Sequence, residues 1–288
     1  MKKTPRRIFP AIILTIFVLG AFVTAPPAAK TSGPLIVHAG KLLDVRSGKT
    51  LNDQAIVIDG GKIVSVGPFA QASRSTGDRL IDLGNATVLP GLTDAHTHMT
   101  GDPQDVGYEG LGISIPRSTL IGARNAHLTL EAGFTTVRNV GASGYSDIAL
   151  RDAINAGDVP GPRMLASGPP LSITGGHGDE NFLAPQFGFS EDGVANGVDG
   201  VMAKVRENIK YGADVIKFMA TGGVLSEGDN PALAQYSLEE MKAIIETAHG
   251  LGRKVAAHAH GSLGIKYAVL AGVDRWSTEA ISTKKISR

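Results

Sequence analysis

The stretch GLTDAHTHMTGD, from Gly91 to Asp102, places two histidines one residue apart directly after an apolar run. Side chains at positions i and i+2 of a strand point to the same side, so His96 and His98 would project together. One interpretation is a polar pair at a solvated strand end. The other is a pair of imidazoles that converge on one metal ion. The surrounding sequence distinguishes between these two interpretations.

Around this stretch, strand-like and helix-like segments alternate along the chain. Val201, Val205 and Ile209, for example, share one face of a predicted helix, and Ser237 with Glu240 forms a capping box. The segments in order are residues 86–98, 118–133, 134–141, 146–157, 162–168, 198–212, 213–223, 237–250, 254–261 and 263–272. This alternation predicts a parallel sheet with right-handed crossovers.

The predicted fold class is α/β, an incomplete (β/α)₈ TIM-like barrel over residues 87–288 with about six strands present. Functional groups of such barrels stand at the C-terminal ends of the strands, which is where His96 and His98 lie. Residues 30–86 have instead the pattern of short strands and turns, which predicts a hairpin turn at Asp59-Gly60-Gly61. We therefore expect a small N-terminal β-sandwich domain without evident chemistry of its own.

Residues 1–29 carry the pattern of a secretory signal peptide. A basic start is followed by an apolar run from Ile8 to Val23 and then by small residues. We expect export to the periplasm or the medium, with no stable membrane association after removal of the signal. A retained anchor is the alternative, although the run is short for a membrane-spanning helix. Pro26 and Pro27 leave the cleavage site undefined.

Composition narrows the class of protein further. The 288 residues are 42% hydrophobic and 19% charged, which is ordinary globular composition. A formal net charge of +1 gives no polybasic basis for nucleic-acid binding. The chain has no cysteine, which excludes disulfides, thiolate metal sites, cysteine nucleophiles and lipoprotein anchors.

The segment ADVIKFMATGG holds a lysine in the middle of a predicted strand. Alternation places Ile216 and Phe218 on the face that packs against helices, which turns Lys217 toward the barrel interior. A buried ammonium is costly, so the side chain extends to solvent, pairs with a carboxylate, or loses its proton. In the last case the free amine could react with carbon dioxide, and the resulting carbamate could bridge two metal ions.

The next predicted strand, KVAAHAHG, repeats the i and i+2 pattern with His258 and His260. Either histidine could bind a metal ion, cap a helix or lie in the core. Histidines at several strand ends of one barrel favour a shared site over unrelated structural roles.

The segments VLPGLTDAHTHM, ADVIKFMATGGVLS and KVAAHAHG, in this order, resemble motifs of the amidohydrolase superfamily. The resemblance is closest to its imidazolonepropionase-like and prolidase-like metallohydrolases and covers roughly residues 35–274. It implies a (β/α)₈ barrel beside a β-sandwich, with one or two metal ions, usually Zn²⁺, bridged by a carboxylated lysine. His96 and His98 would then bind the more buried ion, Lys217 would bridge, and His258 would bind the second. His260 remains the alternative to His258.

The resemblance also implies substrate contacts and a reaction. The loop SITGGHGDE, with His177, resembles a substrate-facing loop of these enzymes, and a purely structural role for this histidine stays open. Backbone N–H groups of Thr221, Gly222 and Gly223 could bind a substrate carboxylate. The metal ions would lower the pKa of a bridging water and polarise the scissile carbonyl. The expected substrate is a small-molecule amide, and oligomeric state is left open.

The chain departs from the family pattern in strand two and near its C-terminus. Relatives often carry Arg-Asp where this chain has Arg138-Asn139, a position outside the expected ligand set. No histidine follows His260 and no aspartate follows Asp274, so the expected strand-six ligand and strand-eight proton carrier are missing, and no residue is assigned as the catalytic base.

The tail after Asp274 predicts a C-terminal truncation. Relatives continue with a segment like Ser-Ile-Glu-His-Gly, and one possible coding of residues 275–283, read two bases later, gives Val-Glu-His-Gly. A single-base deletion or a naturally short chain would both account for this. We expect such a product to fold poorly and to hydrolyse little, because an open sheet exposes an unpaired edge.

The leading functional hypothesis is a metal-dependent hydrolase of C–N bonds in dipeptides or N-acyl amino acids. Hydrolysis of cyclic amides or esters is the alternative within enzymes, since the same kind of site serves both. A non-catalytic remnant that binds a metal ion or ligand is the alternative from another class.

Overall fold

The computed structural model describes residues 33–276 except 105, 106, 225 and 227, and its chain divides into two compact units, Met1–Pro90 and Gly91–Arg288. The predicted signal peptide, residues 1–29, lies outside the described residues. In the described part of the chain, no helix is both long and apolar enough to cross a membrane.

The described residues of the first unit form a four-stranded sheet. Its elements are β1 (Leu35–Asp44), β2 (Lys49–Asp59), β3 (Lys62–Pro68), the 3₁₀ turn η1 (Phe69–Gln71) and β4 (Arg79–Val88). The strand order is β3-β2-β1-β4, with β1 parallel to β4 and the other pairs antiparallel. The predicted hairpin is confirmed, because Gly60 and Gly61 join β2 to β3 with φ of 55° and 75°. One sheet is described here, so the second layer of a sandwich stays a prediction.

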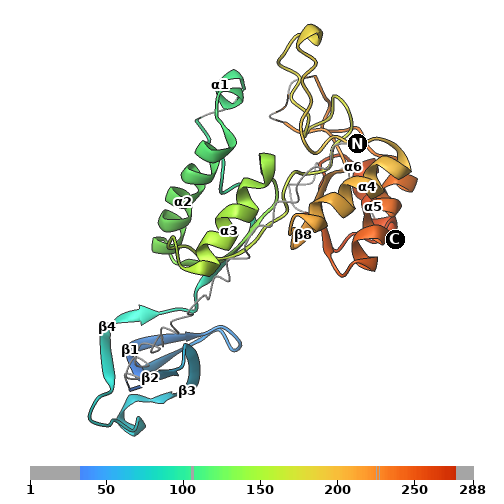
Figure 1. Cartoon of the computed structure of the whole chain (residues 1–288). Coiled ribbons are helices and arrows are strands. Elements are labelled where there is room, and N and C mark those ends of the chain that lie inside the picture. Colours follow the sequence, from blue (N-terminus) through green and yellow to red (C-terminus); the bar gives the residue numbers. More distant parts are fainter. Residues whose placement is uncertain (1–32, 105–106, 225, 227, 277–288) are drawn as a thin grey trace, which may run out of the picture. The chain divides into compact units, whose positions relative to one another are not determined.

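The second unit alternates strands and helices as the sequence predicts (Figure 1). Its elements are β5 (Leu92–Thr97), α1 (Tyr108–Leu111), α2 (Ile115–Glu131), β6 (Phe134–Asn139), η2 (Ser143–Tyr145), α3 (Ser146–Ala156), β7 (Arg163–Leu165), η3 (Pro185–Phe187), α4 (Gly197–Lys210), β8 (Val215–Met219), α5 (Leu238–Gly250), β9 (Lys254–His258), α6 (Ser262–Leu270) and β10 (Arg275–Trp276). The capping box of Ser237 and Glu240 is present at the start of α5, and Gly157 ends α3 in a left-handed conformation.

In the described part of this unit, six parallel strands follow one another in chain order. β5-β6-β7 and β8-β9-β10 each form a three-stranded parallel sheet. The segment after β7 connects them, because Ala166 O accepts from Asp214 N at 2.8 Å and Leu171 N donates to Lys217 O at 2.8 Å. The result is a partial TIM-like α/β fold, and the C-terminal ends of the strands share one edge.

The boundary between the units corrects one sequence prediction. Residues 86–88 were expected to begin the first barrel strand, but they end β4, where Thr87 and Val88 pair with β1. The first barrel strand, β5, starts only at Leu92. The reason is Pro90, which lacks a backbone N–H and so interrupts strand pairing between the two segments.

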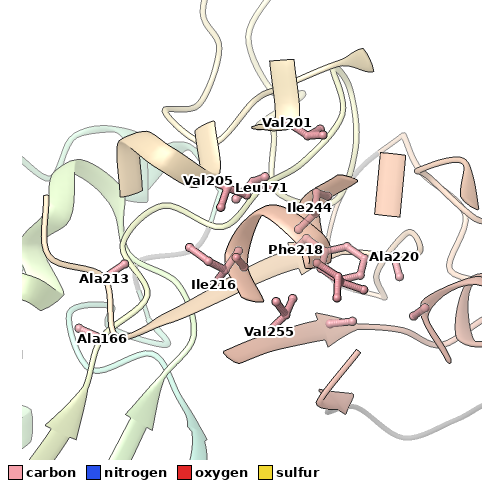
Figure 2. Packing of buried hydrophobic residues seen from close by; sticks show 14 of the residues in the cluster. Ala166, Leu171, Val201, Val205, Ala213, Ile216, Phe218, Ala220, Ile244 and Val255 are labelled. Carbon is pink, nitrogen blue, oxygen red and sulfur yellow. The ribbon is translucent and has the colours of Figure 1, made fainter. Parts of the chain in front are cut away.

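Part of the core of the second unit lies between β8, β9 and the helices that cover them (Figure 2), and the same cluster continues to α2, β6, α3 and β7. Ile216 and Phe218 of β8 are fully buried and belong to the same cluster as Val201, Val205 and Ile244. The predicted alternation of β8 is therefore confirmed, since the residues between them face the other side of the sheet. Val215 packs there with Val140, which follows β6, and with Ala256 of β9 in a second small cluster.

Candidate active site

His96 and His98 lie at the C-terminal end of β5, as predicted. Their ring centroids are 5.4 Å apart. Burial by the surrounding protein and, second, the Lys217 ammonium lower the pKa of both imidazoles to about 4. Part of the His98 side chain is exposed, and it lines a cavity. His98 Nδ1 donates to Gly141 O at 3.3 Å, which leaves Nε2 unprotonated in the neutral ring. Both side chains are thus neutral imidazoles, the form that binds metal ions.

Lys217 is buried inside the partial barrel, with a relative exposure of 1%. Burial, and then the Arg138 guanidinium, lower the pKa of its amine to about 7. Burial lowers the pKa of four histidines, His96, His98, His177 and His258, and the charge of Lys217 adds to this lowering in each of them. Lys217 is therefore a common neighbour of the histidines from β5 and of those from the later loops.

The long loop after β7 and the end of β9 bring three further histidines together. The ring centroid of His258 lies 4.1 Å from that of His177 and 4.7 Å from that of His260. His258 Nε2 donates to Gly222 O at 3.2 Å, and burial followed by the neighbouring His177 lowers its pKa to about 2. His260 is also buried, and its backbone N–H donates to Thr221 Oγ1. His258 and His260, the two alternative metal ligands from β9 and the residues after it, thus lie in one cluster.

The predicted substrate donors of the segment 221–223 are already engaged inside the chain. Gly222 N donates to Leu233 O at 3.3 Å, and Gly223 N donates to Asp229 Oδ2 at 3.1 Å. Thr221 is fully buried, and its hydroxyl donates to Gly222 O. In the free chain these glycine N–H groups thus have acceptors on the loop that follows them, and their contact with a substrate carboxylate stays a prediction.

A cavity of about 420 Å³ connects part of the predicted site with residues that sequence reasoning missed. His98, His177 and Met219 line it, together with Glu180 and Glu191. Burial, then the neighbouring Glu180, raises the pKa of Glu191 to about 7. The pair Asp179-Glu180 beside His177 was the available signal in the sequence. A groove of about 610 Å³ between α4 and α5 contains none of the predicted site residues.

The donor chemistry of the site fits a metal ion if Lys217 carries a carboxylate. Among the described residues, no three His, Cys, Asp or Glu side chains are gathered as a ready metal cage. The neutral imidazoles from β5 and β9 both neighbour the buried Lys217 amine instead. A carbamate on that amine would add the anionic oxygens that the histidines lack.

The family model of the amidohydrolase family matches residues 87–282, more than half of the chain. The chain belongs to the amidohydrolase family. Within this family it is 36% identical to ochratoxinase of Aspergillus niger over 255 residues, which cover 82% of this chain and 52% of the relative.

Solved structures of the family agree with this assignment. A Xaa-Pro dipeptidase with bound methionine superposes with a TM-score of 0.77 and 39% identity, over 85% of this chain and 61% of the dipeptidase. A prolidase complexed with N-methylphosphonate-L-proline gives a TM-score of 0.76 and 34% identity, over 85% and 60%. The chain thus spans about half to three fifths of the length of these amidohydrolase-family relatives.

Proposed function

We propose that this chain is a metal-dependent hydrolase of C–N bonds that acts on dipeptides. The observation that carries the proposal is the buried Lys217 amine, whose charge acts on four largely neutral histidines, His96, His98, His177 and His258. The similarity to a Xaa-Pro dipeptidase, a prolidase and an ochratoxinase supports C–N bonds as the target.

His96, His98 and His258 would hold the metal ion, with a carbamate on Lys217 as the anionic ligand. With its pKa lowered to about 7, a large fraction of the amine is neutral at neutral pH. The neutral nitrogen attacks carbon dioxide, a C–N bond forms, and one proton leaves to water. The product carries a negative charge where the reacting amine was neutral. A bound Zn²⁺ would supply an activated water and polarise the scissile carbonyl.

The cavity favours dipeptides over N-acyl amino acids. A dipeptide carries a cationic α-amino group at neutral pH, and an N-acyl amino acid does not. Glu180 and Glu191 line the same cavity as His98 and His177. Two carboxylates beside the histidines would attract an ammonium group and would offer nothing to a neutral acyl chain.

Two further features complete the proposal. The four-stranded sheet of the first unit would be one layer of a β-sandwich, as the family resemblance implies. Residues 1–29 would direct export to the periplasm or the medium and would then be removed. N-terminal sequencing of the mature protein tests the export, since a start after residue 29 is expected and an intact Met1 would contradict it.

The enzyme proposal is tested with purified full-length chain. We expect bound zinc by elemental analysis, and hydrolysis of Ala-Pro that disappears with a chelator and returns with Zn²⁺. N-acetyl-Ala-Pro should be a poorer substrate by an order of magnitude or so, because it lacks the ammonium group. Zinc binding without any turnover would support a binding role instead of an enzyme. Turnover that persists without metal would refute the metal dependence.

A further inference from the structure

Ser226 and Asp229 lie behind His177, on the loop that follows β8. His177 Nδ1 is 2.8 Å from Ser226 Oγ, and the Ser226 hydroxyl donates to Asp229 Oδ1 at 2.6 Å. Asp229 Oδ2 accepts from Gly223 N at 3.1 Å and from Gln235 Nε2 at 3.0 Å. The mechanism outlined above gives these contacts no role.

The hydrogen bonds between Asp229, Ser226 and His177 determine the tautomer of His177. A serine hydroxyl has one proton, and here the carboxylate of Asp229 takes it, because an ionised carboxylate can only accept. Toward His177, the Ser226 oxygen can therefore only accept as well. Nδ1 of His177 must carry the hydrogen, so Nε2 of the neutral ring bears a lone pair.

The contacts of the His177 ring fix the direction in which the Nε2 lone pair points. His177 lines the cavity with His98, Glu180 and Glu191, and its Nδ1 edge is held by Ser226. A Cβ at Gly223 would lie 2.1 Å from Nδ1 and Cε1 of His177, so the ring lies flat against this glycine. Its backbone is also fixed, since His177 N donates to Gln235 Oε1 at 3.1 Å. The imidazole therefore has a defined orientation with Nε2 at the opposite edge.

We propose that Ser226 and Asp229 are positioning residues that hold His177 as the Nδ1–H tautomer, so that Nε2 accepts a hydrogen bond from an N–H of the bound substrate. This inference rests on the proposed function for the nature of that substrate. The ammonium group of a dipeptide provides such an N–H, and the carboxylates of Glu180 and Glu191 line the same cavity. Asp229 acts through Ser226 and need not touch the substrate itself.

The nearly isosteric variant Asp229→Asn separates this proposal from a structural role. The two donors at Oδ2, one of them a backbone N–H, hold the amide oxygen of the new side chain in place. Its NH₂ group then faces Ser226 Oγ and donates to it. The serine hydroxyl is free to donate to His177 Nδ1, and the ring switches to the Nε2–H tautomer. Ser226→Ala, the second variant, removes the partner of Nδ1 altogether.

The test is the ¹⁵N spectrum of histidine-labelled full-length chain kept free of metal, with the His177 signals assigned by their loss in His177→Gln. Wild type should show a protonated Nδ1 and an unprotonated Nε2. Asp229→Asn should reverse the two, and Ser226→Ala should lose the Nδ1–H preference. Asp158→Asn, an exposed carboxylate after α3, is the matched control and should leave the spectrum unchanged.

Addition of Ala-Pro tests the substrate contact. The Nε2 resonance of wild type should shift, and the dissociation constant should rise roughly tenfold in Asp229→Asn, the loss expected for one hydrogen bond. An Nε2–H tautomer in wild type, or an unchanged tautomer in Asp229→Asn, would overturn the positioning role. A resonance that Ala-Pro leaves in place would overturn the contact. If wild type shows the expected tautomer but never hydrolyses Ala-Pro, only the proposed function fails.

Discussion

The proton of Lys217 adds to the effect of burial on the histidines of the candidate site. With the proton, the buried ammonium opposes protonation of the histidines on both sides of it. Without it, the amine is a nucleophile in a pocket that holds neutral imidazoles. No ion pair between Lys217 and a carboxylate occurs among the described residues, so its burial is costly when it is charged. The charged side chain therefore lowers the stability of the metal-free protein, and this effect can be measured separately from metal binding.

Replacement of this amine by an apolar side chain of similar length should separate stability from metal binding. The pKa of Lys217 falls from 10.5 to about 7 on folding, so the unfolded chain binds more protons between these values. Its destabilising effect is therefore complete below pH 7 and declines as the pH rises. In metal-free protein, Lys217→Met should raise the unfolding temperature most below pH 7, while the zinc content of the loaded protein falls.

Lys242→Met, at an exposed position of α5, is the control and should change neither quantity. Full zinc content in Lys217→Met would refute a role of this residue as a metal ligand.

Glu191 predicts a pH dependence of substrate binding. Burial and Glu180 raise the pKa of Glu191 from 4.5 to about 7, so its carboxylate becomes charged only as the pH rises through 7. The ammonium group of a dipeptide is lost near pH 8. KM for Ala-Pro should therefore be lowest between about pH 7 and pH 8 and should increase toward acid. Glu191→Gln should remove the increase toward acid, and an unchanged profile would exclude Glu191 from the binding site.

At the scale of elements, Asn139 and Asp147 connect the ends of β5, β6 and β7. Asn139 Oδ1 accepts from Met99 N at 2.6 Å, and Asn139 Nδ2 donates to Asp147 Oδ2 at 3.0 Å. Asp147 also accepts from Ser167 N and Gly168 N, both at 3.1 Å. Met99 follows His98 directly, so this buried network fixes the strand end that carries the histidine pair.

Loss of the Asp147 carboxylate should destabilise the second unit. Both Asn139 and Asp147 are completely buried, and Asp147→Ala leaves several backbone donors without an acceptor. We expect the free energy of unfolding to fall by about 3 kcal/mol, measured by urea denaturation. Asp158→Ala, at an exposed position after the same helix, should change it by less than about 0.5 kcal/mol. Equal effects of the two variants would show that the network is not needed.

The hydrophobic periodicity of the sequence predicted the helices and caps that depend on local sequence. It predicted fewer of the contacts that depend on distant strands or on loops. The buried face of α4 and the capping box of α5 follow from residue spacing, and both are present. The end of β4 was missed, because its pairing with β1 involves residues almost fifty positions apart. The acceptors of the Gly222 and Gly223 N–H groups were not predicted either, since they lie on a loop whose path the local pattern does not encode.

At the scale of the whole molecule, the site draws on most strands of the second unit. The histidines and the lysine could be predicted because parallel strands end at one edge and carry their polar residues there. Glu180 stands three residues after His177, and that pairing was its only signal in the sequence. Ser226, Asp229 and Glu191 could not be predicted, because loops with no periodic signal bring them to the site. The first unit also holds a histidine with unusual electrostatics, His38 of β1, whose partners lie within the same sheet.

The imidazole of His38 lies between two carboxylates. Its Nε2 is 2.9 Å from Asp53 Oδ1, its Nδ1 is 2.7 Å from Asp82 Oδ1, and its ring stacks on Phe69 at 3.7 Å between centroids. The hydrogen bond to Asp53, and then the bond and charge of Asp82, raise the pKa of His38 above 6.5. Both ring nitrogens donate only in the protonated form, so the folded sheet favours the imidazolium.

The sign of the resulting pH effect follows from linkage. A group whose pKa is raised on folding stabilises fully below its unfolded pKa, and this stabilisation is lost as the pH rises through the folded pKa. His38→Gln should therefore lower the unfolding temperature of the first unit clearly at about pH 5.5 and hardly at about pH 9. Zinc content should stay unchanged, because all partners of His38 lie within β1, β2, η1 and β4. A difference between wild type and variant that grows with pH would mean that His38 is held in its neutral form.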